Sequence, residues 1–121
     1  MEFDLTDAQL SLRNMVREFA SKEIAPRADE YDRQGAIPAD LIRRMASLGL
    51  LGICVPAEYG GAGMDYLAYI LALEEVCGAS AAVGLMMTVN NTLYAEPLMR
   101  FGTDAQKRRW LAPAARGERL G

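Results

Sequence analysis

The sequence from Gly84 to Gly102 reads GLMMTVNNTLYAEPLMRFG, and the rest of the fold depends on it. Between positions 79 and 99 the only formal charge is that of Glu96. A helix so poor in charge is usually enclosed by other elements, so this stretch is predicted to be the central helix of the protein. The adjacent amides of Asn90 and Asn91 lie within it, and buried amides require hydrogen-bond partners.

Pro97 stands in the second half of this helix and is expected to bend it, because proline removes one backbone hydrogen bond. Two interpretations of the helix remain open. In the first it is a plain core helix with a kink. In the second its Met-rich apolar face lines a pocket. The pattern alone favours the first, since core helices far outnumber pockets.

The chain has 121 residues, of which 51% are hydrophobic and 24% charged, as is typical of one globular domain. Its net charge of −3 argues against a nucleic-acid partner. The dense basic cluster at Lys107–Arg109 is most simply a solvated helix face, with a phosphate-contacting patch as the alternative. No apolar run reaches the about 20 residues that cross a bilayer. The acidic start MEFDLTD also lacks the features of a signal peptide.

The chain contains no histidine, which excludes Ser-His-Asp triads, Cys-His pairs and histidine-ligated zinc or di-iron sites. Cys54 and Cys77 lie in apolar surroundings without a CxxC motif, so reduced thiols of an intracellular protein are expected. Glu74 and Glu75 are adjacent and point about 100° apart on a helix, so they cannot act as one facing pair. The pattern therefore assigns no catalytic, cofactor-binding or metal-ligating residue.

Short polar motifs mark where helices begin. Thr6 with Gln9 and Thr103 with Gln106 form two capping boxes, and Asp65 and Ser80 are single N-caps. Helices are predicted from position 6 to about 24, then over 26–32, 38–48, 66–77, 80–101 and 104–112. The helix over 66–77 and the central helix are expected to pack antiparallel, because their connection is very short.

Other segments carry more specific expectations. Ala25-Pro26 is expected to interrupt the first helix. Leu50–Pro56 is interpreted as buried extended chain that joins no sheet. Gly60–Gly63 is interpreted as a turn that needs positive φ angles, because Tyr66 stands where a dinucleotide-binding fingerprint would have its third glycine.

The last part of the chain is predicted to turn Trp110 and Leu111 inward, with Pro113 and Gly117 ending the helix. Glu96 is expected to be exposed beyond the kink. Together the patterns predict an all-α protein, an orthogonal or up-down bundle of about five to six helices in one domain, residues 1–121.

Several motifs recur in a characteristic order: FDLTDAQ from Phe3, VREFA from Val16, IAPRADEYD from Ile24, LGLLGICVPAEYGGAG from Leu48 and FGTDAQKRRWL from Phe101. Each motif is weak alone, but their order and spacing over essentially the whole chain resemble the N-terminal helical domain of the acyl-CoA dehydrogenases. The segments DYLAY from Asp65 and MTVNNTLY from Met87 look most like the short-chain, butyryl-CoA branch of that family.

The resemblance implies a flavoenzyme. In that family a β-domain and a C-terminal helical bundle follow this domain, and FAD lies between those two parts. A glutamate base removes the acyl α-proton while a hydride passes from the β-carbon to the flavin. The implied partners are an acyl-CoA substrate and electron-transfer flavoprotein, in a homotetramer. The implied location is the cytoplasm of a bacterium, or the mitochondrial matrix after removal of a transit peptide.

The family's central helix lines the cavity for the acyl chain, and the resemblance carries this role onto matching positions here. They are Met86, Val89, Asn90 and Leu93, with Leu85 and Tyr94 as neighbours. Met86, Val89 and Leu93 recur at spacings of three and four, so they are expected to share one helix face. Their bulk favours a short acyl chain.

The chain departs from the family by ending before the flavin-contacting segment, so the β-domain, the C-terminal bundle and the catalytic glutamate are expected to be absent. The chain alone is therefore expected to be inactive and to hold no FAD tightly. Two alternatives stay open. One is the first domain of a related acyl-CoA oxidase or nitroalkane oxidase. The other is a non-catalytic helical module for packing or oligomerisation.

Overall fold

The computed structural model describes residues 2–121, and within them the chain forms helices and turns without a strand. The elements form five helical bodies, which confirms the predicted all-α fold. In chain order they are α1 (Asp7–Phe19), η1 (Ala20–Ile24), η2 (Ala25–Arg27) and α2 (Ala28–Gln34) in the first body; α3 (Ala39–Ser47); α4 (Tyr66–Ala79); α5 (Ala81–Thr88), η4 (Val89–Tyr94) and α6 (Ala95–Phe101) in the fourth; and α7 (Asp104–Gln106), η5 (Lys107–Leu111) and α8 (Ala112–Ala115) in the last. One short 3-10 turn, η3 (Ala57–Tyr59), lies in the long connection between α3 and α4.

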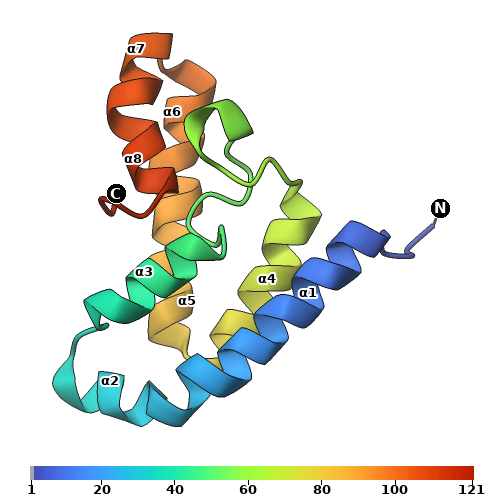
Figure 1. Ribbon diagram of the computed structural model, residues 1–121, viewed down its shortest axis with the longest axis vertical. Coiled ribbons are helices and arrows are strands. Elements are labelled where there is room, and N and C mark those ends of the chain that lie inside the picture. The colour runs from blue at the N-terminus through green and yellow to red at the C-terminus, as the bar shows by residue number, and fades with distance from the viewer. Residues whose placement is uncertain (1) are drawn as a thin grey trace.

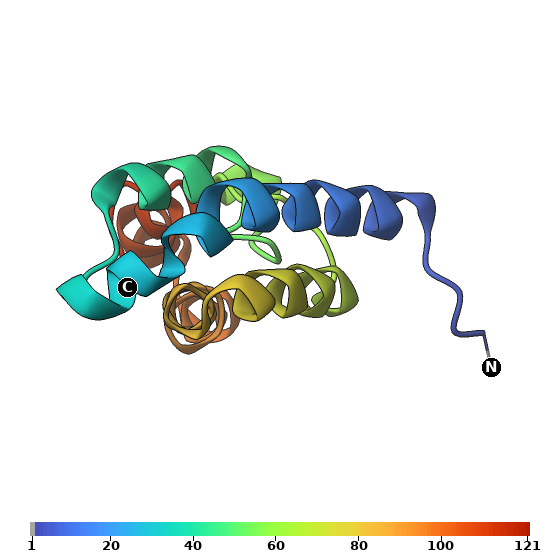
Figure 2. The same cartoon turned by 90° about the horizontal axis from the view of Figure 1, so that it is seen from below.

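The helices are arranged in two layers (Figures 1 and 2). α1 and α3 form one layer, and α4 and α5 form the other. α4 runs alongside α1, and the chain then reverses so that α5, η4 and α6 return along the molecule (Figure 1). The predicted hairpin of α4 and the central helix is thus present, and its arms diverge toward their open ends.

The core lies between these layers. Val83 and Met87 of α5 are fully buried there, as are Val16 of α1 and Met45 of α3. Burying an apolar side chain of this size contributes about 1.5 to 3 kcal/mol, so the layer interface is the main source of stability. A second, smaller cluster joins α6 to η5 and α8 around the buried Leu111 and Ala95.

α4 and α5 approach each other closely at Gly84. A β-carbon built at this glycine would stand 2.2 Å from the sulfur of Cys77 on α4. The glycine is therefore required by the helix crossing. The free thiol of Cys77 lies against it.

The predicted caps are confirmed. Both capping boxes are complete, with Thr6 and Thr103 accepting from the backbone amides of Gln9 and Gln106. Asp65 accepts from Ala68 N and Ser80 from Val83 N. The Gln9 side chain also donates to Asp65 Oδ2 at 3.1 Å, so the N-termini of α1 and α4 are joined.

Three π-helical segments shape the bundle, and each is followed within three residues by a proline. In η1, η4 and η5 the closing amides are those of Ala25, Ala95 and Ala112, which bond five residues back to Ala20, Asn90 and Lys107. The prolines that follow are Pro26, Pro97 and Pro113. A wide turn displaces the backbone just where the proline ring would clash with the preceding helical turn, so the helix bends and continues.

One prediction is confirmed here and one is corrected. A new helical piece begins at Ala25-Pro26, where the 3-10 turn η2 leads into α2, and Gly35 ends it with φ +65°. The last helix, by contrast, continues through Pro113 to Ala115, and it is Gly117, with φ +74°, that follows its end.

The segment Leu50–Pro56 is buried as predicted, but it is not extended. It follows a series of tight turns and bends, with Leu50, Leu51 and Ile53 facing the core. Its backbone groups are satisfied partly by the Asn90 and Asn91 side chains of the central helix and partly by backbone bonds to the turn at residues 61–64.

Candidate functional site

The six residues predicted to line a pocket all lie on the α5–η4 helix, but they face different directions. Leu85 and Leu93 are 65% and 72% exposed. Met86, Val89 and Tyr94 are half-buried, whereas Asn90 is only 1% exposed. The helix therefore presents two leucines outward and turns one amide into the protein.

Met86 faces a groove between α2, α3 and α5. The groove measures about 490 Å³ and is mostly apolar; its lining includes Tyr31, Ile37, Ile42, Met86 and Leu120. Tyr31 forms one wall but its buried hydroxyl has no hydrogen-bond partner within residues 2–121 and no exposed surface. The groove therefore offers mainly apolar contact, with Asp32 as the charged residue of its lining.

Asn90 holds three chain segments together. Its Nδ2 donates to the carbonyls of Leu51 at 2.8 Å and Ala114 at 3.2 Å. Its Oδ1 accepts from the amide of Gly121 at 2.9 Å. The side chain is thus fully engaged with the backbone, which satisfies the requirement predicted for a buried amide.

Asn91 fixes the Leu50–Ile53 segment in the same way. Its Nδ2 donates to Leu50 O and Met87 O, both at 2.9 Å, and its Oδ1 accepts from Ile53 N at 3.0 Å. Because both amides emerge from the π-helical η4, they hold that turn against the loop and so set the direction of the side chains around it.

Glu96 corrects the prediction of an exposed carboxylate, since its side chain is 23% exposed and bonded on both oxygens. The Tyr66 hydroxyl donates to Oε2, and Arg100 Nε donates to Oε1. The hydrogen bond from Tyr66, reinforced by Arg100, lowers the pKa of Glu96. The same bond raises the pKa of Tyr66. This cluster joins the start of α4 to α6, the last part of the central helix.

The glycine turn confirms its predicted role. Gly60 and Gly63 have φ +85° and +65°. The amides of residues 61–64 all bond to carbonyls of residues 52–56. Tyr59 also donates its hydroxyl to Asp104 Oδ1 at 2.7 Å, which docks the turn on the last helix. Because its amides are already used, the turn cannot cradle a diphosphate.

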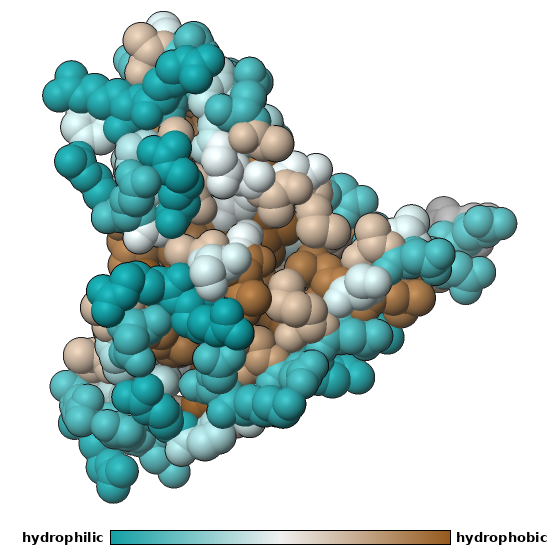
Figure 3. Space-filling model, in the orientation of Figure 1, coloured by the Kyte–Doolittle hydropathy of each residue, from teal (hydrophilic) through white to brown (hydrophobic). Residues whose placement is uncertain are grey.

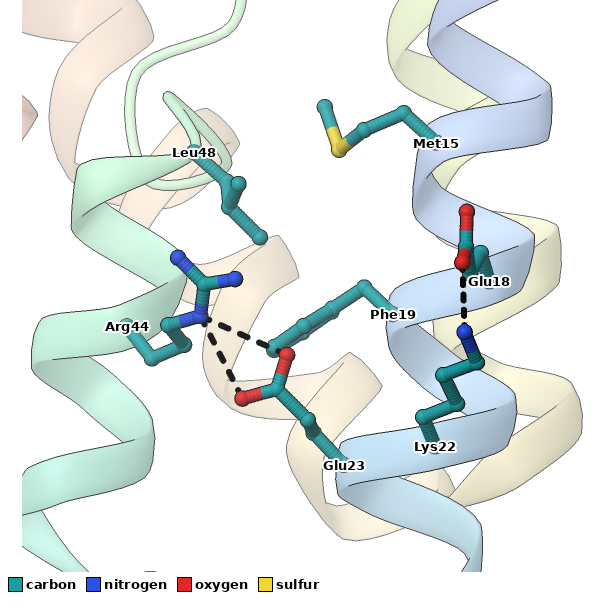
Figure 4. A pocket seen from close by; sticks show the side chains of 7 residues that line it. All are labelled: Met15, Glu18, Phe19, Lys22, Glu23, Arg44 and Leu48. Atoms are coloured by element: carbon teal, nitrogen blue, oxygen red, sulfur yellow. Dashed lines mark hydrogen bonds and ion pairs between the residues drawn. The ribbon is translucent and has the colours of Figure 1, made fainter.

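A second groove lies between α1 and α3 (Figure 4). Met15, Phe19 and Leu48 form its apolar floor, and two ion pairs form its rim. Lys22 pairs with Glu18 at 2.6 Å, and Arg44 pairs with Glu23 at 3.2 Å. In the space-filling view, apolar residues gather at the centre of this face and charged residues surround them (Figure 3). The groove contains no nucleophile or base arranged for catalysis.

Among residues 2–121, no group of histidine, cysteine, aspartate or glutamate residues could hold a metal ion. No helix in the same range is long and apolar enough to span a membrane. Lys107 and Arg108 lie beside the Tyr59 ring, at 5.7 and 5.6 Å from its centroid, so part of the basic cluster packs on the protein itself.

Sequence reasoning missed the contact of Tyr66 with Glu96 and the clamp that Asn91 places on Ile53. The pair of Glu96 with Arg100 was also missed, although their spacing of four residues on one helix could have indicated it. The partners from the other segments lie 30 and 38 positions away in the chain, and no local pattern connects them.

Comparison with known proteins identifies the family. The model of the acyl-CoA dehydrogenase N-terminal domain matches residues 6–118. The chain is 43% identical over 118 residues to the mitochondrial short-chain specific acyl-CoA dehydrogenase of Mus musculus, covering 98% of this chain and 29% of the mouse protein.

Two solved structures share the fold. Butyryl-CoA dehydrogenase from Megasphaera elsdenii superposes with a TM-score of 0.92 at 38% identity, covering all of this chain and 32% of that one. A chain from work on the electron transferring flavoprotein of Acidaminococcus fermentans gives a TM-score of 0.94 at 42% identity, with the same coverage. The chain thus spans about a third of the length of the relatives it matches, and it belongs to the acyl-CoA dehydrogenase family, whose N-terminal domain it forms.

Proposed function

We propose that this chain is the first domain of an FAD-dependent enzyme that dehydrogenates short-chain acyl-CoA thioesters between the α- and β-carbons, and that the α5–η4 helix supplies part of the wall for the acyl chain. The exposure of Leu85 and Leu93 carries this proposal. Two large apolar side chains, 65% and 72% exposed, project from a helix whose neighbouring amides are locked in place. Such a face needs an apolar partner.

An acyl chain against this face would contact side chains that cannot hydrogen-bond. Val89 and Leu93 offer only hydrocarbon, and Met86, which lines the neighbouring groove between α2, α3 and α5, adds a thioether that adapts to shape. Excluding water from this contact would favour chemistry at the carbon next to the thioester. Asn90 would hold the helix in place rather than bind substrate, because its side-chain amide is bonded to the backbone.

The proposal assigns no flavin contact to this domain. The glycine-rich turn at residues 60–63 supports this, because its amides are bonded within the chain. In this proposal the flavin and the catalytic base belong to the parts of the complete enzyme outside this domain. Electron-transfer flavoprotein is the proposed electron acceptor of a tetrameric enzyme. The location would be mitochondrial, as the name of the mouse relative states for that protein, or the bacterial cytoplasm.

Two measurements test the proposal. In a complete enzyme carrying this domain, kcat/KM should be highest for butyryl-CoA or a similarly short thioester and should fall with chain length. Equal rates with long-chain substrates would contradict the assignment of the wall. The isolated chain should bind no stoichiometric FAD. An equimolar flavin spectrum after dialysis would contradict the proposal that the flavin site lies outside this domain.

A further inference from the structure

An acidic arm precedes the first helix. Residues 2–6 form no helix or strand, and they project from a corner of the molecule that is separate from α6 and α7 (Figures 1 and 2). Phe3 lies in this arm and is 84% exposed. Glu2 and Asp4 flank it, and neither they nor Asp7 join any of the ion pairs formed within residues 2–121.

Another corner of the molecule carries an aromatic pocket. It measures about 260 Å³ and is lined by Pro97, Leu98, Phe101, Gly102, Gln106 and Trp110. Phe101 and Trp110 are 84% and 42% exposed. The pocket is an open surface depression, so an aromatic side chain could pack against its Phe101 and Trp110 rings while staying partly exposed to solvent.

The rim of this pocket is basic. The Arg109 guanidinium stacks on the Trp110 ring, 4.9 Å from its centroid. Arg109 and Lys107 take part in none of the ion pairs of residues 2–121, whereas Arg108 and Arg100 are paired with Asp104 and Glu96. Tryptophan and arginine are the residue types most enriched at the energetic centres of protein interfaces.

The arm and the pocket match in chemistry but cannot meet within one molecule. The arm offers one aromatic anchor between unpaired acids, and the pocket offers an aromatic cleft beside unpaired cations. They lie at different corners of the same molecule (Figures 1 and 2). Two copies can satisfy both contacts at once if each inserts its arm into the other, which gives a closed two-fold dimer.

We propose that this chain forms a reciprocal dimer in which Phe3 of each copy enters the Phe101–Trp110 pocket of the other, with Asp4 facing Arg109. The unpaired charges steer the approach, and the aromatic contact supplies most of the affinity. The occupant of the pocket is thus a second copy of this chain.

The first test is the mass of the purified chain by light scattering over a range of concentrations. A dimer is expected, and Phe3→Ala should weaken it about tenfold or more, because the anchor is lost. Since Phe3 is exposed, circular dichroism should show an unchanged helix content. Ile70→Ala removes another exposed apolar side chain, 45% accessible, from α4 and should leave the dimer intact. A monomer at all concentrations, or a dimer that withstands Phe3→Ala, would overturn the proposal.

The second test uses charge reversal in separate chains. Asp4→Lys alone and Arg109→Glu alone each place like charges in both contacts, so each variant should be monomeric. A mixture of the two variants should form a heterodimer, because each arm then meets a pocket of opposite charge. Trp110 is the only tryptophan, so its emission should shift to shorter wavelength only in the mixture. If the mixture stays monomeric while both variants remain folded, the pairing of Asp4 with Arg109 is wrong.

Discussion

Asn91 and Ile53 are joined by a buried hydrogen bond across 38 positions of the chain, from the Ile53 amide to Asn91 Oδ1 at 3.0 Å. The same side chain donates to Leu50 O and Met87 O. One amide on a wide helical turn therefore holds a loop that has no sheet or helix to satisfy its backbone.

Asn91→Leu should destabilise the protein strongly. The substitution keeps the size of the side chain but leaves Ile53 N and Leu50 O buried without their partners. Each loss costs about 1 to 3 kcal/mol, so the free energy of unfolding in urea should fall by roughly 2 to 5 kcal/mol. Asn14→Leu, on the exposed side of α1, is the control and should change it by less than about 0.5 kcal/mol.

Gly84→Ala should also destabilise, because its β-carbon would overlap the Cys77 sulfur. Overpacking of this kind costs about 1 to 3 kcal/mol. The cost should shrink in the double variant with Cys77→Ala, which removes the overlapping sulfur. Gly78→Ala, in the same hairpin with open space around it, should instead stabilise by about 0.5 to 1 kcal/mol. Equal effects at the two glycines, measured by thermal unfolding, would show that the crossing is looser than described.

The bond from Tyr66 to Glu96 predicts a specific dependence of stability on pH. The pKa of Glu96 is lower in the folded protein than its ordinary value of 4.5. Its contribution is therefore fully present above about pH 4.5 and is lost as the pH falls through the folded value. Tyr66→Phe removes the largest cause of the shift.

Urea titrations between pH 6 and pH 3 measure this effect. The wild-type protein should lose more stability over that interval than Tyr66→Phe does. Tyr94→Phe is the matched control, because the Tyr94 hydroxyl donates to the backbone carbonyl of Trp110 and not to a carboxylate. Parallel curves for all three proteins would show that Glu96 titrates independently of Tyr66.

The proposed acyl wall predicts a change of specificity. In a complete enzyme carrying this domain, Val89→Ala or Leu93→Ala should move the preferred substrate toward longer acyl chains, by about three- to tenfold in the ratio of kcat/KM values. One methylene in an apolar pocket changes binding by about 1 to 3 kcal/mol at most. Leu67→Ala, which removes an exposed leucine from α4, should leave the ratio unchanged. A shift that follows Leu67 rather than Leu93 would place the wall elsewhere.

The helix starts were predictable because capping is local. Thr6 with Gln9 and Thr103 with Gln106 satisfy the first amides of their own helices within three residues, so the sequence pattern and the contact coincide. The burial of Val83 and Met87 was predictable from the low charge of the central helix, but the exposure of Leu85 and Leu93 was not.

The predictions near prolines were less accurate. Trp110 was expected to face inward with Leu111, yet Trp110 is half-exposed while Leu111 is fully buried. η5 widens the helix there, which changes the direction of side chains relative to an ideal α-helix, and no propensity rule marks a π turn in advance. The partial burial of Glu96 depends on side-chain contacts that the pattern did not reveal, because Tyr66 and Arg100 bond to its carboxylate.

The three π turns also have a consequence for how this chain can vary in length. Each holds one residue more than an α-helix would need to cover the same rise. A single-residue deletion within 20–24 or 107–111 can therefore be absorbed by a return to α-helical winding, without rotating the helices on either side. Within 89–94 the same holds only for deletions that keep Asn90 and Asn91, because these bond the Leu50–Ile53 segment. The same deletion in the middle of α1 or α4 would turn everything beyond it by about 100°. Tolerance of the chain to deletions should thus be concentrated just before its prolines.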